Sequence, residues 1–243
     1  MAVTPGAAMP SAAIRLDPVE PTLVGTIRSD LGRAADPTRA PQMQAYMKSA
    51  MPYLGVPLPV TRRIARSAAA GCPPSDVADL FASATALWRT ATYREERYAA
   101  AELTGLRLAA GRLEMLPLYR EMIVTGAWWD HVDGISERIG ALLLAHRPVL
   151  EPVIREWSTD PDVWLRRSSI ISQLALKERT DASLLSDVIA PNLADREFFI
   201  RKAIGWALRQ YARTDPDWVR AFVAEHQTSL SPLSRREAMK HLG

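Results

Sequence analysis

Two adjacent tryptophans stand beside two aspartates in the stretch TGAWWDHVDGISERIG, from Thr125 to Gly140. If this stretch is helical, Trp129 and Asp133 lie one turn apart and share a face. An indole face attracts cations, and a nearby carboxylate can stabilise positive charge that develops during a reaction. Asp133 is therefore a candidate functional group, although a solvated surface acid or a salt-bridge partner would have the same spacing.

The same stretch predicts two neighbouring faces on one helix. The apolar face, which repeats at helical spacing and is expected in the core, consists of Trp128, Val132, Ile135 and Ile139. Trp129, Asp133 and Ser136 form the adjacent stripe, beside the core. Asp130 is interpreted as an acid at the helix start, where it complements the helix dipole. The two tryptophans are thus expected to have different roles.

A second stretch, REFFIRKAIGWALRQYAR at residues 196–213, repeats this arrangement. Its predicted buried stripe consists of Ile200, Ile204, Ala207 and Tyr211. A neighbouring stripe at the same spacing combines cations with a tryptophan: Lys202, Trp206, Arg209 and Arg213. With Arg196 and Arg201, the stretch holds five basic residues against one acid, Glu197. Such local charge favours binding of phosphates, with an ordinary solvated face as the alternative.

Helices must position these residues, because no segment shows the alternating β-branched pattern of a strand. Helices are expected at residues 18–35, 42–51, 57–70, 75–87, 93–109, 112–124, 128–145, 148–157, 161–177, 181–192, 197–212, 216–226 and 232–242. Asp160 and Asp215 are predicted N-caps, each followed by a proline at the first helical position. The SRRE segment at 234–237 is interpreted as a capping box.

A repeat of 35 residues organises the helical segments. Four similar seven-residue segments begin at Arg94, Trp129, Trp164 and Phe199. Periods of this length are typical of helix-hairpin solenoids. Moving the third segment by one residue places Arg167 opposite Asp133, with Lys202 one period later. We therefore expect Asp133 among cations on one face of a solenoid.

The composition limits the kinds of site that the chain can hold. The formal net charge is +3 and the isoelectric point is near 9.2, so only clustered charge favours a nucleic acid partner. Cys72 is the single cysteine, and the four histidines lack metal-ligand spacing, so we expect no disulfide and no metal site. No GxGxxG, P-loop or GxSxG motif is present, and no cofactor is expected.

The ends and the hydropathy of the chain predict its organisation and location. Residues 1–16 are rich in alanine and proline and are expected to form a disordered tail, with residues 17–243 as a single domain. No secretory signal and no apolar run of membrane-spanning length is present. A soluble cytoplasmic protein is expected.

Several motifs together resemble the AlkD-type DNA alkylation repair glycosylases. They are AYMKSAMPYLGVPLPVTRR (45–63), WWDHVD (128–133), DVWLRRSSIISQLALKERTD (162–181), EFFIRKAIGWALRQYARTDPDWV (197–219) and PLSRREAMKHL (232–242). The resemblance covers residues 42–243 in order. It implies an all-α, right-handed superhelical solenoid of HEAT-like repeats with a concave, basic groove for duplex DNA.

The resemblance also implies roles for individual residues. Asp133 corresponds to the catalytic aspartate, with Trp129 and Trp206 flanking the lesion. The residues expected to contact DNA are Tyr46, Arg167, Phe199, Arg201, Lys202, Arg209 and Arg213.

The implied activity is hydrolysis of the N-glycosidic bond of cationic alkylpurines, N3-alkyladenine and N7-alkylguanine, in duplex DNA, which begins base excision repair. The resemblance implies that the enzyme acts without a base-flipping pocket, and an open solenoid face offers no obvious pocket. A monomer associated with the nucleoid is expected. The alternatives are a DNA-binding repeat protein without hydrolase activity and, from another class, a solenoid that binds a peptide.

Overall fold

The computed structural model describes residues 22–242, so the predicted disordered tail at 1–16 lies outside the described residues. Within them the fold is all-α, with thirteen α-helices and no strand. The helices are α1 (Leu23–Arg33), α2 (Ala40–Met47), α3 (Leu58–Gly71), α4 (Val77–Arg89), α5 (Arg94–Leu103), α6 (Leu116–Gly126), α7 (Trp129–Ala145), α8 (Arg147–Trp157), α9 (Val163–Ile171), α10 (Ala182–Ile189), α11 (Phe198–Tyr211), α12 (Pro216–Glu225) and α13 (Pro232–Ala238). Every expected helix is present, and only the ends differ.

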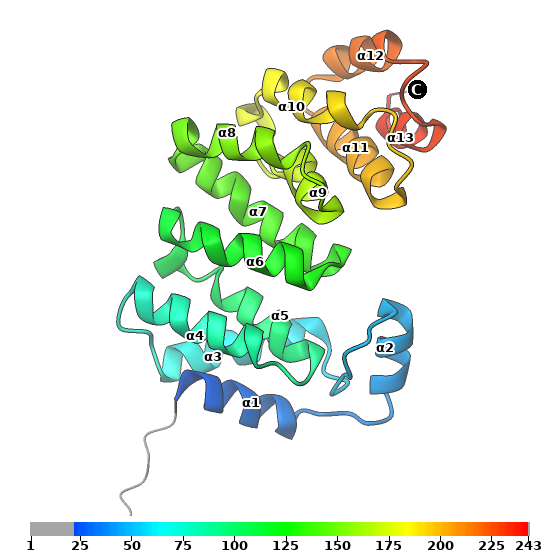
Figure 1. Cartoon of the computed structure of the whole chain (residues 1–243). Helices are drawn as coiled ribbons and strands as arrows, with labels where there is room; N and C mark the ends of the chain where they lie inside the picture. Colours follow the sequence, from blue (N-terminus) through cyan, green and yellow to red (C-terminus); the bar gives the residue numbers. More distant parts are fainter. Residues whose placement is uncertain (1–21, 243) are drawn as a thin grey trace, which may run out of the picture.

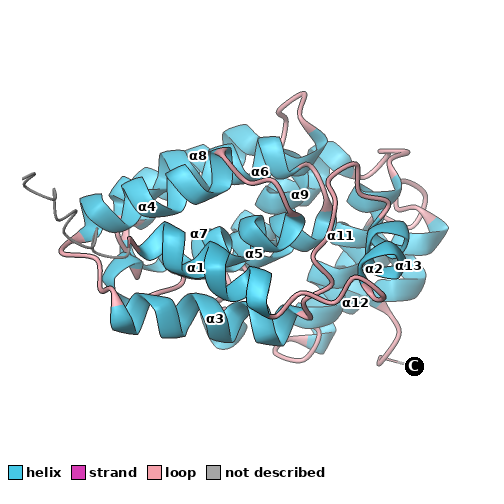
Figure 2. Cartoon of the chain, turned by 90° about the horizontal axis from the view of Figure 1, so that it is seen from below, coloured by secondary structure: helices cyan, strands magenta, loops and turns pink. Residues whose placement is uncertain are grey.

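The helices stack in chain order, from α1 at the bottom of Figure 1 to α12 at the top. Helices α3, α5, α7, α9, α11 and α13 pack one against the next, and we call them the odd-helix layer. Figure 2 shows α4, α6 and α8 along one side of the molecule, with α5, α7 and α9 beside them. The predicted solenoid of helical repeats is confirmed.

The 35-residue period is visible in where the helices of the odd-helix layer begin. Helices α5, α7, α9, α11 and α13 begin at residues 94, 129, 163, 198 and 232, so successive starts lie 35, 34, 35 and 34 residues apart. Each repeat contributes one helix to this layer. A single helix pair cannot bury its apolar face alone, and stacking against the neighbouring repeats buries it. The repeat therefore brings equivalent positions of successive helices next to each other.

Both predicted apolar stripes pack in the core, with Trp128 and Tyr211 as their half-buried members. On α7, Val132, Ile135 and Ile139 are fully buried, and on α11 Ile200 and Ile204 are fully buried. The first stripe belongs to a cluster that runs from α1 to α10, and the second belongs to a cluster formed by α9 to α13. Within residues 22–242, no helix combines the length and the hydropathy needed to cross a bilayer.

Of the three predicted helix caps, those at Asp160 and at residues 234–237 are wrong, and the one at Asp215 is confirmed. The cap of α9 is Asp162, whose side chain accepts from the backbone N–H of Trp164 and Leu165. Asp160 instead accepts from the backbone of Asp162, in the turn before the helix. The predicted cap Asp215 is confirmed at α12, with Pro216 at the first helical position.

The capping box predicted at 234–237 is also wrong. The cap of α13 is Ser231, which accepts from the backbone N–H of Ser234. Ser234 lies inside the helix, where its hydroxyl donates to the carbonyl of Arg201 on α11. Glu237 is thereby free of a capping role.

One glycine lets α7 approach α9 closely. A Cβ atom at Gly140 would lie 2.3 Å from the carbonyl oxygen of Ser172, which caps α9. That distance is far below van der Waals contact, and backbone cannot move aside as a flexible side chain can. Any larger residue at this position must therefore push the two helices apart.

We predict that Gly140→Ala destabilises the protein by about 1–3 kcal/mol, because overpacking at a helix contact strains both backbones. Gly134→Ala is the matched control on the same helix, where a Cβ would meet only Arg138 at 4.0 Å. The control is expected to stabilise by up to about 1 kcal/mol, since alanine has the higher helix propensity. Urea denaturation of the two variants measures the difference, and equal stabilities would contradict the close approach.

Candidate active site

Asp133 and Arg167 form a two-pronged ion pair between α7 and α9. The Nε and Nη2 atoms of Arg167 donate to the two carboxylate oxygens of Asp133, at 2.8 and 2.9 Å. The Nη1 atom donates at 2.7 Å to the carbonyl oxygen of Phe199 on α11. Arg167 thus links three successive helices of the odd-helix layer. The predicted placement of Arg167 opposite Asp133 is confirmed.

The carboxyl group of Asp133 is largely buried, and its pKa is raised. Burial raises the pKa of Asp133, and the hydrogen bonds and charge of Arg167 oppose this rise without cancelling it. The side chain of Asp133 keeps 19% of its surface exposed, whereas that of Arg167 keeps 5%. A reacting group can therefore reach the carboxylate, while its partner is held inside the stack.

The exposed side of Asp133 faces a cavity of about 400 Å³ between α2, α3, α5 and α7. The cavity brings together three predicted site residues, Tyr46, Trp129 and Asp133. Its other charged lining side chains are Arg62, Glu102, Asp130 and Arg138. We expected no obvious pocket on this face, and that expectation is wrong. The volume lies within the usual range for small-molecule sites.

Two aromatic side chains lie at the mouth of this cavity. Trp129 begins α7 with 36% of its surface exposed, and Tyr46 on α2 is 77% exposed. Trp128 is half-buried and packs against the rings of Trp164 and Phe199, with ring centroids 6.1 and 5.3 Å away. The predicted division of the tryptophan pair between core and surface is confirmed.

Ser136 does not lie beside the core as predicted. It is buried, and its hydroxyl donates to the carbonyl of Val132 and bonds to the hydroxyl of Ser168 on α9 at 2.9 Å. The Trp129 stripe therefore passes under α9 after Asp133, which leaves Trp129 and Asp133 as its accessible members.

Asp130 has a larger role than that of a helix-start acid. It does lie in the first turn of α7, but its carboxylate accepts from Arg94 on α5 at 2.7 and 3.0 Å. The hydroxyl of Tyr98 donates to the same carboxylate at 2.5 Å. Burial, followed by the charge of Asp130, raises the pKa of Tyr98 far above its usual value, so this hydroxyl keeps its proton. The predicted 35-residue register sets Arg94 within one residue of Asp130, a signal that could have revealed the pair.

The neighbour of Arg94 holds the other wall of the cavity. Glu95 is fully buried, and its carboxylate accepts from the backbone N–H groups of Leu54, Gly55 and Val56 at 2.9–3.1 Å. These residues belong to the segment that joins α2 to α3. Glu95 therefore holds the end of this segment, just before α3, against α5.

His131 is buried between two aromatic rings. Its ring centroid lies 5.0 Å from that of Trp88 and 5.1 Å from that of Tyr98. Within the described part of the chain, neither ring nitrogen has a hydrogen-bond partner. Burial lowers the pKa of His131 to about 3. The imidazole is a neutral packing group in the lining of the cavity.

The predicted cationic stripe lies on α11 except for Arg213, which follows the end of the helix, and part of the stripe is paired with an acid. Lys202 and Arg209 both contact Glu237 of α13, at 3.3 and 2.7 Å. Arg213 is exposed and Arg201 is half-buried. The half-buried ring of Trp206 packs on the second core cluster, and it is not among the residues that line the cavity beside Asp133.

Phe199 is a packing residue in this structure. Its ring lies among Trp128, Trp164 and Phe198, and the guanidinium of Arg167 lies 6.0 Å from its centroid. The exposed aromatic of the pair is Phe198, at 52%. Sequence reasoning did not single out Phe198. Both residues are phenylalanines, and only the faces of α11 on which they lie decide which ring is exposed.

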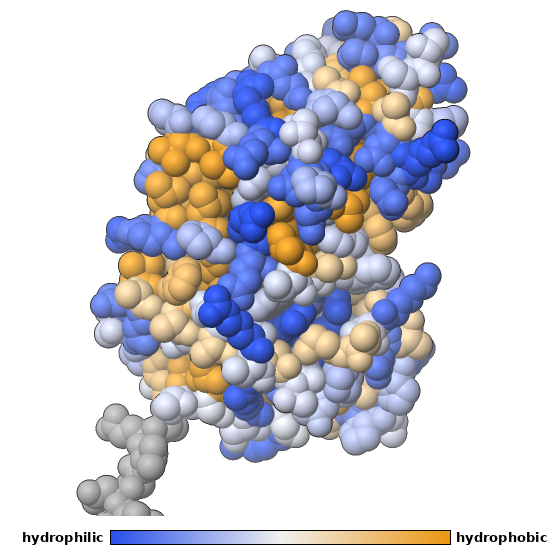
Figure 3. All heavy atoms as spheres, in the orientation of Figure 1, coloured by the Kyte–Doolittle hydropathy of each residue, from blue (hydrophilic) through white to orange (hydrophobic). Residues whose placement is uncertain are grey.

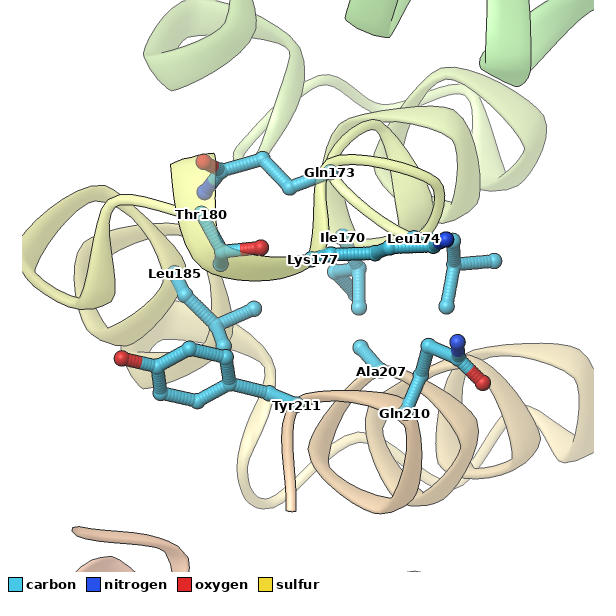
Figure 4. A pocket seen from close by; sticks show the side chains of 9 residues that line it. All are labelled: Ile170, Gln173, Leu174, Lys177, Thr180, Leu185, Ala207, Gln210 and Tyr211. Atoms are coloured by element: carbon cyan, nitrogen blue, oxygen red, sulfur yellow. The ribbon is translucent and has the colours of Figure 1, made fainter. Parts of the chain in front are cut away.

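A second pocket, between α9, α10 and α11, is shown in Figure 4. Its volume is about 10 Å³, and none of its nine lining side chains is a predicted site residue. Such a space holds about one water molecule. Apolar patches also occur elsewhere, as Figure 3 shows near the left ends of α6 and α8, so exposed apolar surface alone marks no site. Across residues 22–242, no cluster of three histidine, cysteine or acidic side chains could hold a metal ion.

Comparison with known proteins identifies the family of the chain. A sequence profile described as DNA alkylation repair enzyme matches residues 27–242. The structure of a predicted DNA alkylation repair enzyme from Enterococcus faecalis has 32% identity and a TM-score of 0.76, covering 86% of this chain and 97% of that one. The crystal structure of AlkD2 from Streptococcus mutans has 17% identity and a TM-score of 0.59, covering 76% of this chain and 90% of that one, and shows a similar fold. No curated protein matches the sequence.

We predict that His131 makes the protein less stable in acid. Unfolded His131 takes up a proton below about pH 6.5, whereas the folded imidazole does so only near pH 3, so acid favours the unfolded state. Between these pH values the free energy of unfolding should fall by about 1.4 kcal/mol per pH unit because of this group. Urea denaturation of wild type and His131→Phe across this range isolates its contribution. Parallel curves for the two proteins would refute the prediction.

Proposed function

The chain belongs to the DNA alkylation repair enzyme family, and on that premise we propose that it is a DNA glycosylase for cationic alkylated purines. The substrates are N3-alkyladenine and N7-alkylguanine in duplex DNA. The observation that carries the proposal is the carboxylate of Asp133, which is held by Arg167 and faces a cavity shared with Trp129.

The proposed reaction needs little from the protein beyond one well-placed anion. Alkylation at N3 or N7 makes the purine cationic, so the base leaves as a neutral molecule when the bond to C1′ breaks. Positive charge then grows on the deoxyribose, and a carboxylate beside C1′ stabilises it. Water attacks C1′ and loses a proton, which Asp133 accepts. No general acid is required, and no cofactor takes part.

Burial makes Asp133 suited to this role. In surroundings with little water, a carboxylate interacts more strongly with developing charge than it does in solution. The same burial raises its pKa, which improves it as a proton acceptor, while Arg167 keeps it ionised. The ion pair also fixes the orientation of both carboxylate oxygens.

The aromatic residues are proposed to hold the nucleotide against Asp133. Trp129 stands one turn away on the same helix and is accessible, so its ring can contact the cationic nucleotide. A contact of this kind contributes about 0.5–2 kcal/mol, enough for positioning but not for the whole rate enhancement. Trp206 of α11 is proposed to flank the lesion from the other side. Tyr46, which is 77% exposed and lines the cavity, is proposed to contact DNA.

Duplex DNA is the proposed partner of the cationic stripe on α11. Arg201, Lys202, Arg209 and Arg213 are proposed to contact phosphates. Arg167 and Phe199, also expected at the DNA, are proposed to support the site from inside, where the carbonyl of Phe199 holds the guanidinium of Arg167. The exposure of Arg213 and the partial exposure of Arg201 and Lys202 support this role. Arg167 uses three N–H groups for Asp133 and Phe199 and its side chain is only 5% exposed, so its proposed part is to hold Asp133.

Excision is proposed to proceed without base flipping. The cavity volume is within the range of pockets that hold small molecules. We propose that Asp133 reaches the deoxyribose from outside the DNA double helix. We further propose that the protein is a monomer that acts in the cytoplasm on the nucleoid.

Asp133→Asn is expected to bind duplex DNA normally and to excise N7-methylguanine at least roughly tenfold more slowly than wild type, because a positioned catalytic group is lost. Asparagine keeps the size of the side chain and can still accept from Arg167. Single-turnover excision and duplex binding are measured on the same preparations. Undiminished excision would remove Asp133 from the mechanism, and absence of excision by the wild type would favour a non-catalytic DNA-binding protein.

Arg167→Met is expected to move the acid limb of the excision rate to higher pH. Asp133 must be ionised to act, its pKa is already above the usual 3.8, and loss of Arg167 removes the interactions that lower it. The measurement is the single-turnover rate across pH for wild type and variant. A guanidinium that served only phosphates would weaken DNA binding and leave the acid limb in place, so an unmoved limb contradicts the positioning role.

A further inference from the structure

A single acid joins two cations of the α11 stripe. One carboxylate oxygen of Glu237 lies 3.3 Å from Nζ of Lys202, and the other lies 2.7 Å from Nη1 of Arg209. The side chain of Glu237 keeps 17% of its surface exposed, against 37% for Lys202 and 25% for Arg209. All three charges thus lie at the surface of the contact between α11 and α13, within reach of a ligand.

The backbone holds this acid in place. A Cβ atom at Gly205 of α11 would lie 2.5 Å from Cβ of Glu237 and 3.0 Å from the carbonyl oxygen of Ser234, so only glycine permits this approach. The hydroxyl of Ser234 donates to the carbonyl of Arg201 at 2.9 Å, which ties α13 to α11 once more. Glu237 is therefore not a mobile surface side chain that meets the cations by chance.

The contacts also affect the charge of Glu237. Burial raises the pKa of its carboxyl, but the bond to Lys202 and the charges of Lys202 and Arg209 outweigh that effect and bring the pKa below its usual value. The carboxyl group of Glu237 is therefore ionised at neutral pH. It offers the two cations what a phosphate would offer, namely two negatively charged oxygens.

We propose that Glu237 is an internal counter-ion that occupies Lys202 and Arg209 in the free protein and competes with DNA phosphate for them. This inference rests on the proposed function, since it requires that the α11 stripe binds duplex DNA. A phosphate that arrives must share or displace the carboxylate, so Glu237 lowers the affinity for DNA. The effect is largest for undamaged duplex, where phosphate contacts supply nearly all of the binding.

A built-in competitor has a use in a protein that must search DNA. Phosphate contacts are independent of sequence and of damage, so each additional one lengthens the time spent at undamaged sites. A carboxylate that cancels part of the local charge weakens this binding and leaves the contacts around Asp133 unchanged. Glu237 therefore tunes discrimination between damaged and undamaged DNA.

The test is Glu237→Gln, which keeps the size of the side chain and removes the charge. Its dissociation constant for undamaged duplex DNA, measured by fluorescence anisotropy, should fall roughly threefold or more at low salt. The plot of log K against log salt should steepen by about 0.9 for each cation that gains a phosphate. Glu225→Gln is the matched control, because it removes the same charge from an exposed position on α12.

A double-substitution background separates competition from a general change in charge. In Lys202→Gln/Arg209→Gln protein, adding Glu237→Gln should leave the dissociation constant unchanged, because the cations through which Glu237 acts are gone. An undiminished effect in that background, an equal effect of Glu225→Gln, or weaker binding by Glu237→Gln would each overturn the proposal. Thermal unfolding checks the fold of each variant, and Glu237→Asp, expected to give a smaller increase in affinity, carries the test if Glu237→Gln does not fold.

The outcomes for this inference and for the proposed function are distinct. A wild-type protein that does not bind duplex DNA even at low salt contradicts the proposed function. A wild-type protein that binds DNA, with an affinity that Glu237→Gln leaves unaltered, contradicts only the role of Glu237.

Discussion

The ion pair of Asp133 and Arg167 is the interaction on which the rest of the site depends. Isolated charges are costly to remove from water, and a buried pair is tolerated only when its hydrogen bonds are satisfied. Here the guanidinium satisfies both carboxylate oxygens and a backbone carbonyl of the next helix. The pair therefore requires α7, α9 and α11 to keep one relative placement. It also leaves the carboxylate, and not the cation, accessible from outside.

The same device recurs along the odd-helix layer. Arg94 of α5 pairs with Asp130 of α7, and Arg209 of α11 pairs with Glu237 of α13. Each pair joins neighbouring helices of this layer, and the paired residues lie 36 and 28 positions apart in the sequence. The pairs differ in burial, since the Arg94 pair is nearly inaccessible and the Arg209 pair lies at the surface. The buried pair can only hold structure, whereas the surface pair can exchange its partner.

Sequence reasoning predicted the helices, their period and the meeting of Arg167 with Asp133, because all three follow from spacing along single helices and from the repeat. It failed where a third element decides the outcome. Ser136 shares the helical spacing of Trp129 and Asp133, yet α9 covers it. The SRRE segment matches a capping pattern, yet Ser231 begins the helix and Glu237 turns to α11. The cavity beside Asp133 depends on α2 and α3, and the segment that joins them is held by a carboxylate on α5 and not by any local pattern.

Arg94 and Glu95 are consecutive residues that hold opposite walls of that cavity. Arg94 grips the start of α7, and Glu95 grips the segment after α2. One turn of α5 is therefore bonded on one side to the start of α7, which carries Trp129, and on the other to the segment that leads into α3. Two walls of the opening share a single anchor, so a shift of this one turn would act on both at once.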